Sequence, residues 1–558
     1  MAWMKIASIV LLLALAVQGS ALAQDRLVVD CNLFFNNNGN CPATEARLGT
    51  ACADTFNTCD LINTIFPNNE TIDPEFINDP LLNQLAPDFR VTAGGNATHL
   101  GGAPVGVVPN DGFFTQPYFV GAMGSGADED WTKPWCYYPT NGAGRTDLPN
   151  GAPNVVSGNI TSNTTWGDVV DGYLLSGTVR VLAPAVLTIQ PGVVIFGEEA
   201  TTGTLIIEQG ARINAVGTPE QPIIFTSDAL PGQQDRGQWG GVVLNGRAPV
   251  NCAAVPGGTC EGEGGSGTFG GNLPNDNSGT LRYVRIEYAG KEFSLDNELN
   301  ALTQNGVGSG TTIDHVQTHR GFDDGFEWFG GTNNVHHIIA TDCGDDHLDW
   351  QVGYRGKVQY AISRHVADVT TADRGIEADN YEFGFDNSPR SNPTFSNVTI
   401  VGTRGQAAGG RGITLRRGTA GTIINSIIYN TRGVAVDLDD AATFNNCWGT
   451  PCTLLRDQVG IAAEPAVPVS APLAVNLAPN PFNPSTQVAF TLTEPGAVRV
   501  AVYDSNGRLV DEIAGHGELA AGRQTFSWNA PAGASSGTYY YRVEAAGQVA
   551  TGKMHLIK

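Results

Sequence analysis

Positively charged residues are scarce in this sequence. The 558 residues include 31 Lys and Arg against 55 Asp and Glu, a formal net charge of −24. A strongly acidic surface repels phosphates, which argues against nucleic acid or an anionic membrane as a partner and fits divalent cations. Methionine is also rare, with 4 residues, whereas there are 70 glycines. A composition so poor in helix formers and rich in turn residues predicts many short strands joined by turns.

Long hydrophobic runs are missing too, apart from one at the start. Lys5 is followed by the apolar run IASIVLLLALAV and then by a small-residue pattern that ends at Ala23. This run is too short to span a bilayer, so residues 1–23 are predicted to be a signal peptide cleaved before Gln24. No Cys directly follows, which argues against a lipoprotein, and no later run is long enough for a membrane span. We expect a mature chain that is exported and soluble.

The CxxC spacing of zinc sites is absent, although the chain contains ten cysteines. An even number of cysteines in an exported chain predicts disulfides that close small loops. Eight lie in close pairs that we expect to be disulfides: Cys31 with Cys41, Cys52 with Cys59, Cys252 with Cys260, and Cys447 with Cys452. Cys136 and Cys343 are left over.

From residue 156 to residue 460 the chain consists of short β-type runs separated by Gly, Asn or Asp. Among them are IDHVQTHRG from Ile313, VHHIIATDC from Val335 and VQYAISRHV from Val358, spaced by 22 and 23 residues. A strand-and-turn repeat of this length is typical of a β-solenoid, in which each coil buries its apolar face against its neighbours. We predict an all-β chain built on a right-handed parallel β-helix, a pectate-lyase-like solenoid. Gly-rich stretches such as the one from Pro256 are expected to project from one edge.

The flanking regions differ from the repeat in texture. Residues 24–155 are rich in Asn, Pro and Gly and predict an irregular, Cys-containing N-terminal region. Residues 461–475, rich in Ala and Pro, predict a semi-stiff linker. Residues 476–558 alternate apolar and polar side chains between turns such as Asn506-Gly507, which predicts a small antiparallel, Ig-like β-sandwich.

Four ordered motifs in the last 80 or so residues resemble the C-terminal sorting domain of the type IX secretion system. They are NPFNPSTQVAFTL from Asn480, VYDSNGRLV from Val502, AAGRQTFSWNA from Ala520 and SGTYYYRVEAAG from Ser536. The resemblance implies recognition by the type IX secretion machinery and export across a Gram-negative-type outer membrane. The mature protein would then be secreted or attached to the outer face of the cell.

The central region resembles a family of exported bacterial β-helix proteins that usually carry this sorting domain. The motifs are DWTKPW at Asp130, GQWGGVVLNGRAPVN at Gly237, NDNSGTLRYVRIEYAG at Asn275 and DDGFEWFGG at Asp323. The resemblance implies a fold and a location and no activity.

Two acidic-aromatic phrases, GFDDGFEWFGG from Gly321 and GDDHLDWQVGY from Gly344, are candidates for a site. If their 22-residue offset is one coil, each residue stacks on its counterpart at about 4.8 Å, Asp324 on Asp346 among them. Strand alternation then puts Asp324 and Asp346 on the aromatic, inward face. The other four carboxylates form an outward patch that suits calcium, to which Glu377 and Asp379 from the next coil could add. This candidate metal set is Asp323, Glu327, Asp345 and Asp349; the alternative is that they are solvated turn residues.

The same phrases admit an enzyme. CGDDH at Cys343 resembles the GDD phrase of polygalacturonases, which implies Asp324, Asp345 and Asp346 as catalytic acids and Arg416-Arg417 as a site for an acidic sugar. The NTDG, GHG and RIK motifs of that family are absent.

Aromatic residues in the N-terminal region are candidates for sugar binding. Trp131 and Trp135 lie near two tyrosines and either stack on a glycan or pack this region onto the β-helix. We expect an exported β-helix protein with a structural, adhesive or glycan-binding role. The alternatives are a polysaccharide-degrading hydrolase or lyase and a calcium-braced surface-layer component.

Overall fold

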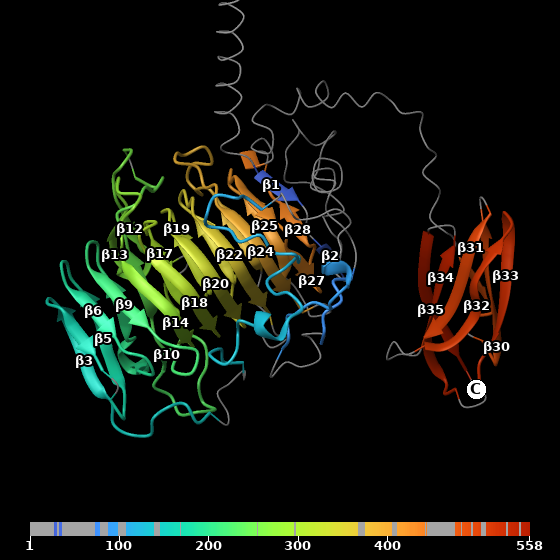
Figure 1. Cartoon of the computed structure of the whole chain (residues 1–558), viewed down its shortest axis with the longest axis horizontal. Coiled ribbons are helices and arrows are strands. Elements are labelled where there is room, and N and C mark those ends of the chain that lie inside the picture. Colours follow the sequence, from blue (N-terminus) through green and yellow to red (C-terminus); the bar gives the residue numbers. More distant parts are fainter. Residues whose placement is uncertain are drawn as a thin grey trace, which may run out of the picture. The chain divides into compact units, whose positions relative to one another are not determined.

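The computed structural model divides the chain into two compact units, Met1–Gln458 and Val459–Lys558, shown in Figure 1. It describes residues 27–30, 33–35, 73–78, 87–98, 108–138, 145–167, 169–253, 255–294, 297–365, 374–403, 410–440, 442–443, 475–480, 482–492, 495–503, 509–531, 534–545 and 548–557. The predicted signal peptide and all but the last residue of the predicted linker lie outside these residues. Among the described residues, no helix is long and apolar enough to cross a membrane.

Three of the four predicted disulfides also lie outside the described residues. These are the predicted bonds of Cys31 with Cys41, of Cys52 with Cys59, and of Cys447 with Cys452, which therefore stay predictions. The fourth, between Cys252 and Cys260, is present with a sulfur–sulfur distance of 2.00 Å.

The first unit is a right-handed parallel β-helix, as predicted, and its strands form three faces. The first face contains β4 (Thr164–Trp166), β6 (Val186–Ile189), β9 (Arg212–Val216), β26 (Gly421–Ile424) and the first halves of five long strands: β14 (Gly279–Glu287), β18 (Thr312–His319), β20 (Asn334–Thr341), β22 (Lys357–Arg364) and β24 (Thr394–Val401). Their second halves continue into the second face with β7 (Val194–Gly197), β10 (Ile223–Ser227), β27 (Ile427–Tyr429) and the first halves of β3 (Asn154–Ile160) and β5 (Tyr173–Val181).

The third face carries the candidate carboxylates. It continues from the second halves of β3 and β5 into β8 (Thr204–Ile207), β11 (Gly241–Asn245), β17 (Leu302–Asn305), β19 (Phe326–Phe329), β21 (Leu348–Gln351), β23 (Arg374–Asp379), β25 (Arg411–Arg416) and β28 (Val436–Leu438). Its inward side chains, such as Phe326, Trp328, Leu348 and Trp350, are fully buried in the core that all three faces enclose. Strand alternation therefore sends Glu327 and Asp349 outward.

The bend between the first and second faces is built from residues with a left-handed backbone. His315, His337 and Tyr360 have φ of +56°, +49° and +65°, values that side chains larger than glycine seldom adopt. Their rings stack from coil to coil, with centroids 4.3 Å apart between the two histidines and 5.0 Å apart between His337 and Tyr360. The stacked column offsets the strain of the bend.

The N-terminal region runs back along this bend from the last coil to the first. Two short strands, β1 (Leu27–Asp30) and β2 (Leu33–Phe35), pair in parallel with β26 and β27 and so add a further coil at the C-terminal end. Residues 73–78, 87–98 and 108–138 then pack over the column, with two short 3-10 turns, η2 (Asn96–Thr98) and η3 (Ala127–Glu129). Near its end, Arg145 forms a buried ion pair with Glu287. The predicted irregular region thus contains part of the solenoid.

Two insertions, one before and one after β14, fold over the third face, and we call them together the insertion. It contains β12 (Cys260–Gly262), η5 (Glu263–Gly265), β13 (Gly267–Phe269), and, after β14, the hairpin of β15 (Lys291–Ser294) and β16 (Asn297–Leu299). Leu299 packs on Ile206 and Val243, which point outward from the third face. The insertion therefore covers this face, whereas the sequence predicted that it would project from an edge.

The second unit is a small β-sandwich, as predicted. One sheet contains β29 (Asn476–Ala478), β30 (Ser485–Leu492) and β33 (Gly522–Asn529); the other contains β31 (Gly496–Tyr503), β32 (Leu509–Leu519), β34 (Gly537–Ala545) and β35 (Gln548–Leu556). All pairings among these strands are antiparallel. Val488, Phe490 and Leu492 alternate into its core, which the periodicity of the sequence anticipated.

Candidate functional site

The two acidic-aromatic phrases stack as predicted. Strand β19 pairs with β21 so that Glu327 faces Asp349 and Trp328 faces Trp350. The next pairing places Asp349 against Glu377 of β23. We call the column of outward positions on the third face the outward row; in order it contains Ile206, Val243, Thr303, Glu327, Asp349, Glu377, Thr414 and Asp437. Its main acidic stretch runs from β19 to β23 and includes the neighbouring carboxylates of Asp324 and Asp379; we call the β19 side and the β23 side of this stretch the two ends of the row.

Asp324 and Asp346 are also neighbours, but their predicted direction was wrong. The amide of Asp346 donates to Asp324 Oδ1 at 2.8 Å. The Asp324 carboxylate lies with those of Glu327 and Asp349, outside the core, and Asp346 pairs with Arg374 at 3.4 Å. The reason is that both aspartates precede the first residue of their strands, in a turn where the two-residue alternation of a strand does not hold.

Glu327 and Asp349 face outward, as predicted, but the carboxylates of the predicted patch are covered. Glu327 and Asp349 are only 4% and 5% exposed, and Asp324 and Asp346 are similarly buried. Asp323 and Asp345, one coil apart at the start of the phrases, are half-buried. The covering insertion brings Glu263 close enough to act electrostatically on Glu327, and Glu298 close enough to act on Asp323.

Burial and like charge together shift these acids strongly. Burial raises the pKa of Asp324 well above its usual value, and the charges of Asp323, Glu327, Asp349 and Asp346 raise it further. Burial likewise raises the pKa of Glu327 and of Asp349, with Glu263 adding to the first and Glu377 to the second. A protonated acid in this cluster is therefore favoured over an ionised one unless another positive charge is present.

Arginines neutralise the far end of the outward row. Glu377 pairs with Arg374 at 2.8 Å and with Arg416, while Asp379 pairs with Arg416 and Arg417, both at 2.8 Å. Arg416 and Arg417, which the enzyme hypothesis offered to a sugar acid, are therefore engaged by the protein's own carboxylates. Burial and Asp379 still raise the pKa of Glu377 to about 7, against the lowering effect of Arg416 and Arg374.

The carboxylates form two overlapping groups with metal-ligand spacing. One contains Asp323, Asp324 and Asp345; the other contains Asp324, Glu327 and Asp349. In each group one oxygen from every carboxylate lies within 4.8 Å of the others. The four residues predicted as a single metal set are thus divided between two groups, and Asp324, predicted only as a catalytic acid, joins them.

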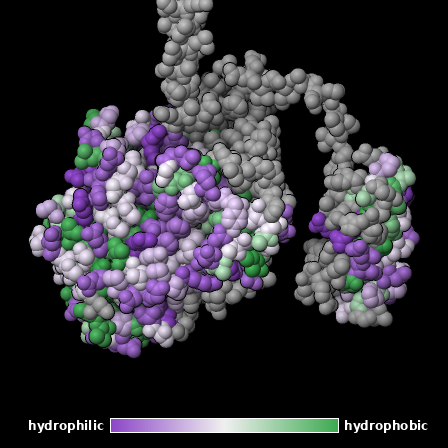
Figure 2. Space-filling view, viewed as in Figure 1, coloured by the Kyte–Doolittle hydropathy of each residue, from purple (hydrophilic) through white to green (hydrophobic). Residues whose placement is uncertain are grey.

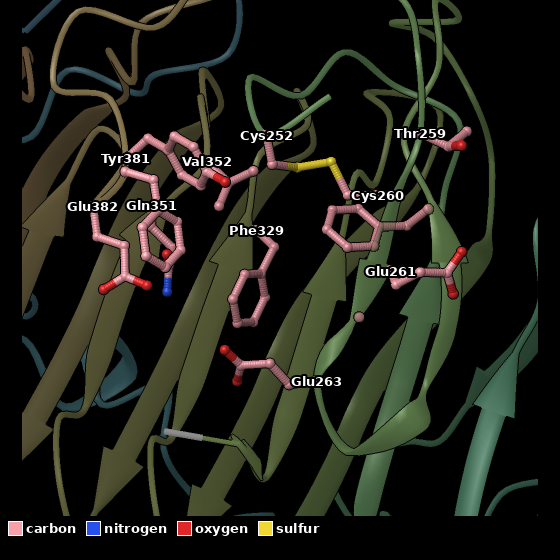
Figure 3. Close-up of a pocket in the computed structure, with 13 residues that line it drawn as sticks. Cys252, Thr259, Cys260, Glu261, Glu263, Phe329, Gln351, Val352, Tyr381 and Glu382 are labelled. Carbon is pink, nitrogen blue, oxygen red and sulfur yellow. A yellow bond between two sulfur atoms is a disulfide. The ribbon is translucent and has the colours of Figure 1, made fainter. Parts of the chain in front are cut away.

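A pocket of about 350 Å³ opens beside the outward row, between the insertion and the third face (Figure 3). Gln351 connects the two, because its side chain lines the pocket and its Nε2 donates to Glu327 Oε1 at 2.8 Å. The Cys252–Cys260 disulfide, expected from its spacing, forms part of the rim. Aromatic and acidic side chains line the rest: Phe269, Phe329, Tyr381, Phe383, Glu261, Glu263 and Glu382.

Trp131 and Trp135 pack the N-terminal region onto the β-helix. Both indoles make edge-to-face contacts with the ring of His315, and Trp135 is fully buried, so Trp135 has no free face for a sugar. Trp131 Nε1 donates to the Ala122 carbonyl at 3.0 Å. The packing alternative accounts for the position of Trp135, and the half-buried Trp131 packs at the same contact.

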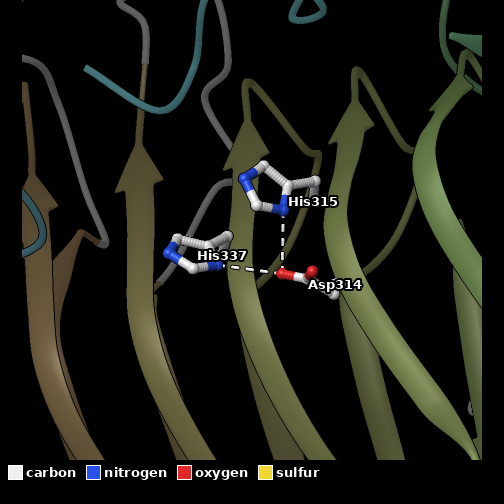
Figure 4. A group of neighbouring side chains, drawn as sticks. All are labelled: Asp314, His315 and His337. Atoms are coloured by element: carbon white, nitrogen blue, oxygen red, sulfur yellow. Dashed lines mark hydrogen bonds and ion pairs between the residues drawn. The ribbon is translucent and has the colours of Figure 1, made fainter. Parts of the chain in front are cut away.

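A third cluster lies in the bend, where Asp314 Oδ1 accepts hydrogen bonds from Nδ1 of His315 at 2.8 Å and of His337 at 2.9 Å (Figure 4). Burial would raise the pKa of Asp314, but the two histidines hold it below its usual value. The imidazoles are stacked with 26° between their planes. Nitrogen lone pairs lie in the ring planes, so those of stacked rings do not converge on one ion at about 2.0 Å. The cluster braces the bend.

The comparisons with known proteins agree with this architecture. A family model described as a pectate-lyase-like β-helix domain matches residues 158–459, more than half of the chain. The chain belongs to the pectate-lyase-like β-helix family. Residues 480–548 match an FlgD Ig-like domain. Neither the comparison with curated proteins nor that with solved structures found a match.

The pocket of this pectate-lyase-like β-helix was not foreseen from the sequence. Tyr381 and Phe383 belong to the aromatic run YEFGF, which begins two residues after the end of β23 at Asp379 and was a usable signal. Glu263 carried no such signal, because it lies some 60 residues from Glu327 and only the folded insertion brings them together.

Proposed function

We propose that this β-helix binds a polysaccharide in the pocket between the insertion and the third face. Two observations support the proposal: membership of the pectate-lyase-like β-helix family and the mixed aromatic and acidic lining of the pocket. The lining carries most of the argument. Phe383 is 80% exposed at the pocket, an unusual position for a large apolar ring.

The lining suits a sugar by its chemistry. The faces of Tyr381 and Phe383 offer apolar surface for the C–H face of a sugar ring. Carboxylates such as Glu261 and Glu382 offer acceptors for its hydroxyl groups. The same carboxylates repel a polyanion, so the proposed ligand is a neutral or amino polysaccharide, not a polyuronate.

Affinity electrophoresis of the full chain through gels that contain one soluble polysaccharide each tests this proposal. We expect a neutral glucan or mannan, or chitosan, to retard the wild type and Phe383→Ala to weaken binding at least fivefold. Tyr118→Ala is the matched control, since Tyr118 is an exposed aromatic residue on the N-terminal region. Retardation by polygalacturonate alone, or equal binding by both variants, would contradict the proposal.

We further propose that the Ig-like domain acts as a type IX sorting domain and that the β-helix functions outside the cell in a structural or adhesive role. The proposal rests on the signal-peptide pattern at residues 1–23 and on the four C-terminal motifs. Deletion of residues 476–558 should retain the protein in the periplasm of a host with a type IX system. Unchanged export of the truncated chain would contradict it.

Hydrolysis of the bound polysaccharide is a second candidate function, favoured by the raised pKa of the acids beside the pocket. A general acid must hold its proton near the working pH, and burial together with neighbouring carboxylates raises the pKa of Asp324 and of Asp346 well above the usual value. Asp324, Asp345 and Asp346 are the acids of this candidate. Asp346→Asn should abolish release of reducing ends from a bound polymer while leaving retardation in the gel unchanged; no release by the wild type would rule the hydrolase out.

A further inference from the structure

The carboxylates of the outward row are unevenly neutralised. At one end, Glu377 and Asp379 have arginine partners at 2.8 Å. At the other end, no Lys or Arg among the described residues forms an ion pair with Asp324, Glu327 or Asp349. Two buried carboxylates one coil apart repel each other, and removing them from water makes the repulsion stronger.

The insertion makes this imbalance greater when it closes. Its folded position is fixed by the Cys252–Cys260 disulfide, by the hydrogen bond from Gly264 N to Asn297 Oδ1 at 2.8 Å and by Leu299 in its apolar site. That position carries Glu263 toward Glu327 and Glu298 toward Asp323. Two acids of the insertion therefore lie near carboxylates of the third face that are distant from them in the sequence.

Asp349 shows that the protein's own groups do not satisfy this cluster. It is 5% exposed, and its Oδ1 accepts no hydrogen bond. Glu327, by contrast, is held in place by the amides of Asn300 and Gln351, which donate to its two oxygens. A buried carboxylate oxygen that lies among other acids and accepts no hydrogen bond lowers the stability of the folded state by several kcal/mol unless something binds it. The missing hydrogen bond alone accounts for about 1–3 kcal/mol of this cost.

The spacing of the oxygens fits a large, hard cation. Calcium binds oxygen ligands at about 2.3–2.6 Å, so two oxygens on opposite sides of one ion lie about 4.6–5.2 Å apart. The oxygens of Asp324, Glu327 and Asp349 lie within 4.8 Å of one another. Magnesium requires ligands near 2.0–2.1 Å in strict octahedral geometry and keeps several waters, which a covered site among carboxylates does not favour.

We propose that Asp324, Glu327 and Asp349 bind one divalent cation, of the calcium class, and that this ion holds the insertion closed over the third face. The ion neutralises the unpaired end of the outward row as arginines neutralise the other end. Asp323 and Asp345, which share Asp324 with this group, are half-buried and extend the cluster toward the surface. The inference does not rest on the proposed polysaccharide, because none of Asp324, Glu327 and Asp349 lines the pocket.

The site is tested by titrating calcium into the chelator-treated full chain and measuring the heat of binding by calorimetry. A parallel titration with terbium measures the luminescence that Trp328 and Trp350 sensitise when the ion binds. We expect Asp349→Asn, which keeps the shape of the side chain, to weaken binding at least tenfold. Glu327→Gln is the second variant and should also weaken calcium binding. Asp437→Asn is the matched control, because Asp437 occupies the same outward row but pairs with Arg411 at 2.7 Å; it should change affinity less than twofold.

Each remaining outcome overturns part or all of the proposal. Absence of binding by the wild type at millimolar calcium and terbium overturns the cation site. Equal loss in Asp349→Asn and Asp437→Asn shows general destabilisation and overturns the assignment to this group. Equal affinity for magnesium and calcium overturns the assignment to the calcium class. Because polysaccharide retardation is measured separately, failure here leaves the proposed function standing, and the reverse also holds.

Discussion

The two ends of the outward row contain the same type of side chain in the same register but differ in what surrounds them. Glu377 and Asp379 pair with three arginines, whereas none of the described Lys or Arg residues forms an ion pair with Asp324, Glu327 or Asp349. Glu263 of the insertion adds a further negative charge beside Glu327, and Arg374 and Arg416 act on Asp349 only through space. Parallel stacking repeats a side chain at about 4.8 Å and so repeats its charge as well. A β-helix that stacks acids must therefore supply an opposite charge at each coil, from its own sequence or from solution.

The exterior of the protein differs from these buried acids. Figure 2 shows hydrophilic and hydrophobic residues interspersed on the visible face of the described residues, as a surface in contact with water requires. The buried acids of the outward row are a separate matter. They are counted in the formal net charge of −24, but they add little charge to the surface. Because they are removed from water, they lower the stability of the folded state.

The largest expected effect comes from removing the positive charge at the neutralised end. Arg416→Ala leaves Glu377 and Asp379 with one arginine each, in a buried setting. Breaking such a pair by removing one partner typically costs about 3–5 kcal/mol. Urea unfolding of the full chain, followed by near-ultraviolet circular dichroism, should show a lowered midpoint.

Arg212→Ala is the control for this variant. Arg212 lies on β9 of the same β-helix and is exposed, so its removal should cost less than about 0.5 kcal/mol. A loss for Arg416→Ala no larger than that of Arg212→Ala would show that the acids of this end do not need their arginines.

Stability should fall with rising pH when the cation is removed. Burial raises the pKa of Glu377 from 4.5 to about 7, so the folded state binds its proton more tightly than the unfolded chain does. The resulting stabilisation, about 3 kcal/mol for a shift of this size, is complete below pH 4.5 and is lost as the pH rises through 7. Thermal unfolding in chelator between pH 5 and pH 8 measures it; saturating calcium should reduce the loss, and a midpoint that rises across this range contradicts the account.

Asp349→Asn should have opposite effects with and without the cation. In chelator the variant removes a buried charge that no basic group pairs, so we expect the free energy of unfolding to rise by about 1–3 kcal/mol at pH 8. In calcium the variant lacks one ligand of the ion, so its free energy of unfolding should be lower than that of the wild type. Urea unfolding of both proteins, in chelator and in calcium, measures the two changes in the free energy of unfolding. A change of the same sign in both solutions would contradict the cation site.

The smallest effect is expected from the insertion. Glu263→Gln removes one of the acids that it carries toward Glu327. In chelator, limited proteolysis within residues 256–273 should slow about twofold to fivefold, because less repulsion opposes closure. Glu261→Gln serves as the control, since Glu261 is exposed on the same insertion. Faster cleavage of Glu263→Gln than of the wild type would mean that Glu263 stabilises the closed form.

The sequence predicted which carboxylates of the site stack on one another. It did not predict the direction of the Asp324 side chain or the insertion that covers the site. A 22-residue offset between two phrases was enough to place Glu327 on Asp349, because coil length alone sets the register. The direction of Asp324 was mistaken because alternation was extended past the start of β19 into a turn. The cover was missed because Glu263 reaches Glu327 only through the packing of Leu299 and the Cys252–Cys260 disulfide, which are contacts between distant segments.

Thermal unfolding of the full wild-type chain at pH 8, in calcium and in chelator, tests most directly whether the unpaired end of the outward row depends on a cation. Mass action predicts that a ligand at 100 times its dissociation constant stabilises the folded state by about 2.7 kcal/mol. We predict a midpoint several degrees higher in calcium than in chelator, with most of the difference abolished in Asp349→Asn. Identical midpoints for the wild type in both solutions would contradict the account and leave the buried acids protonated.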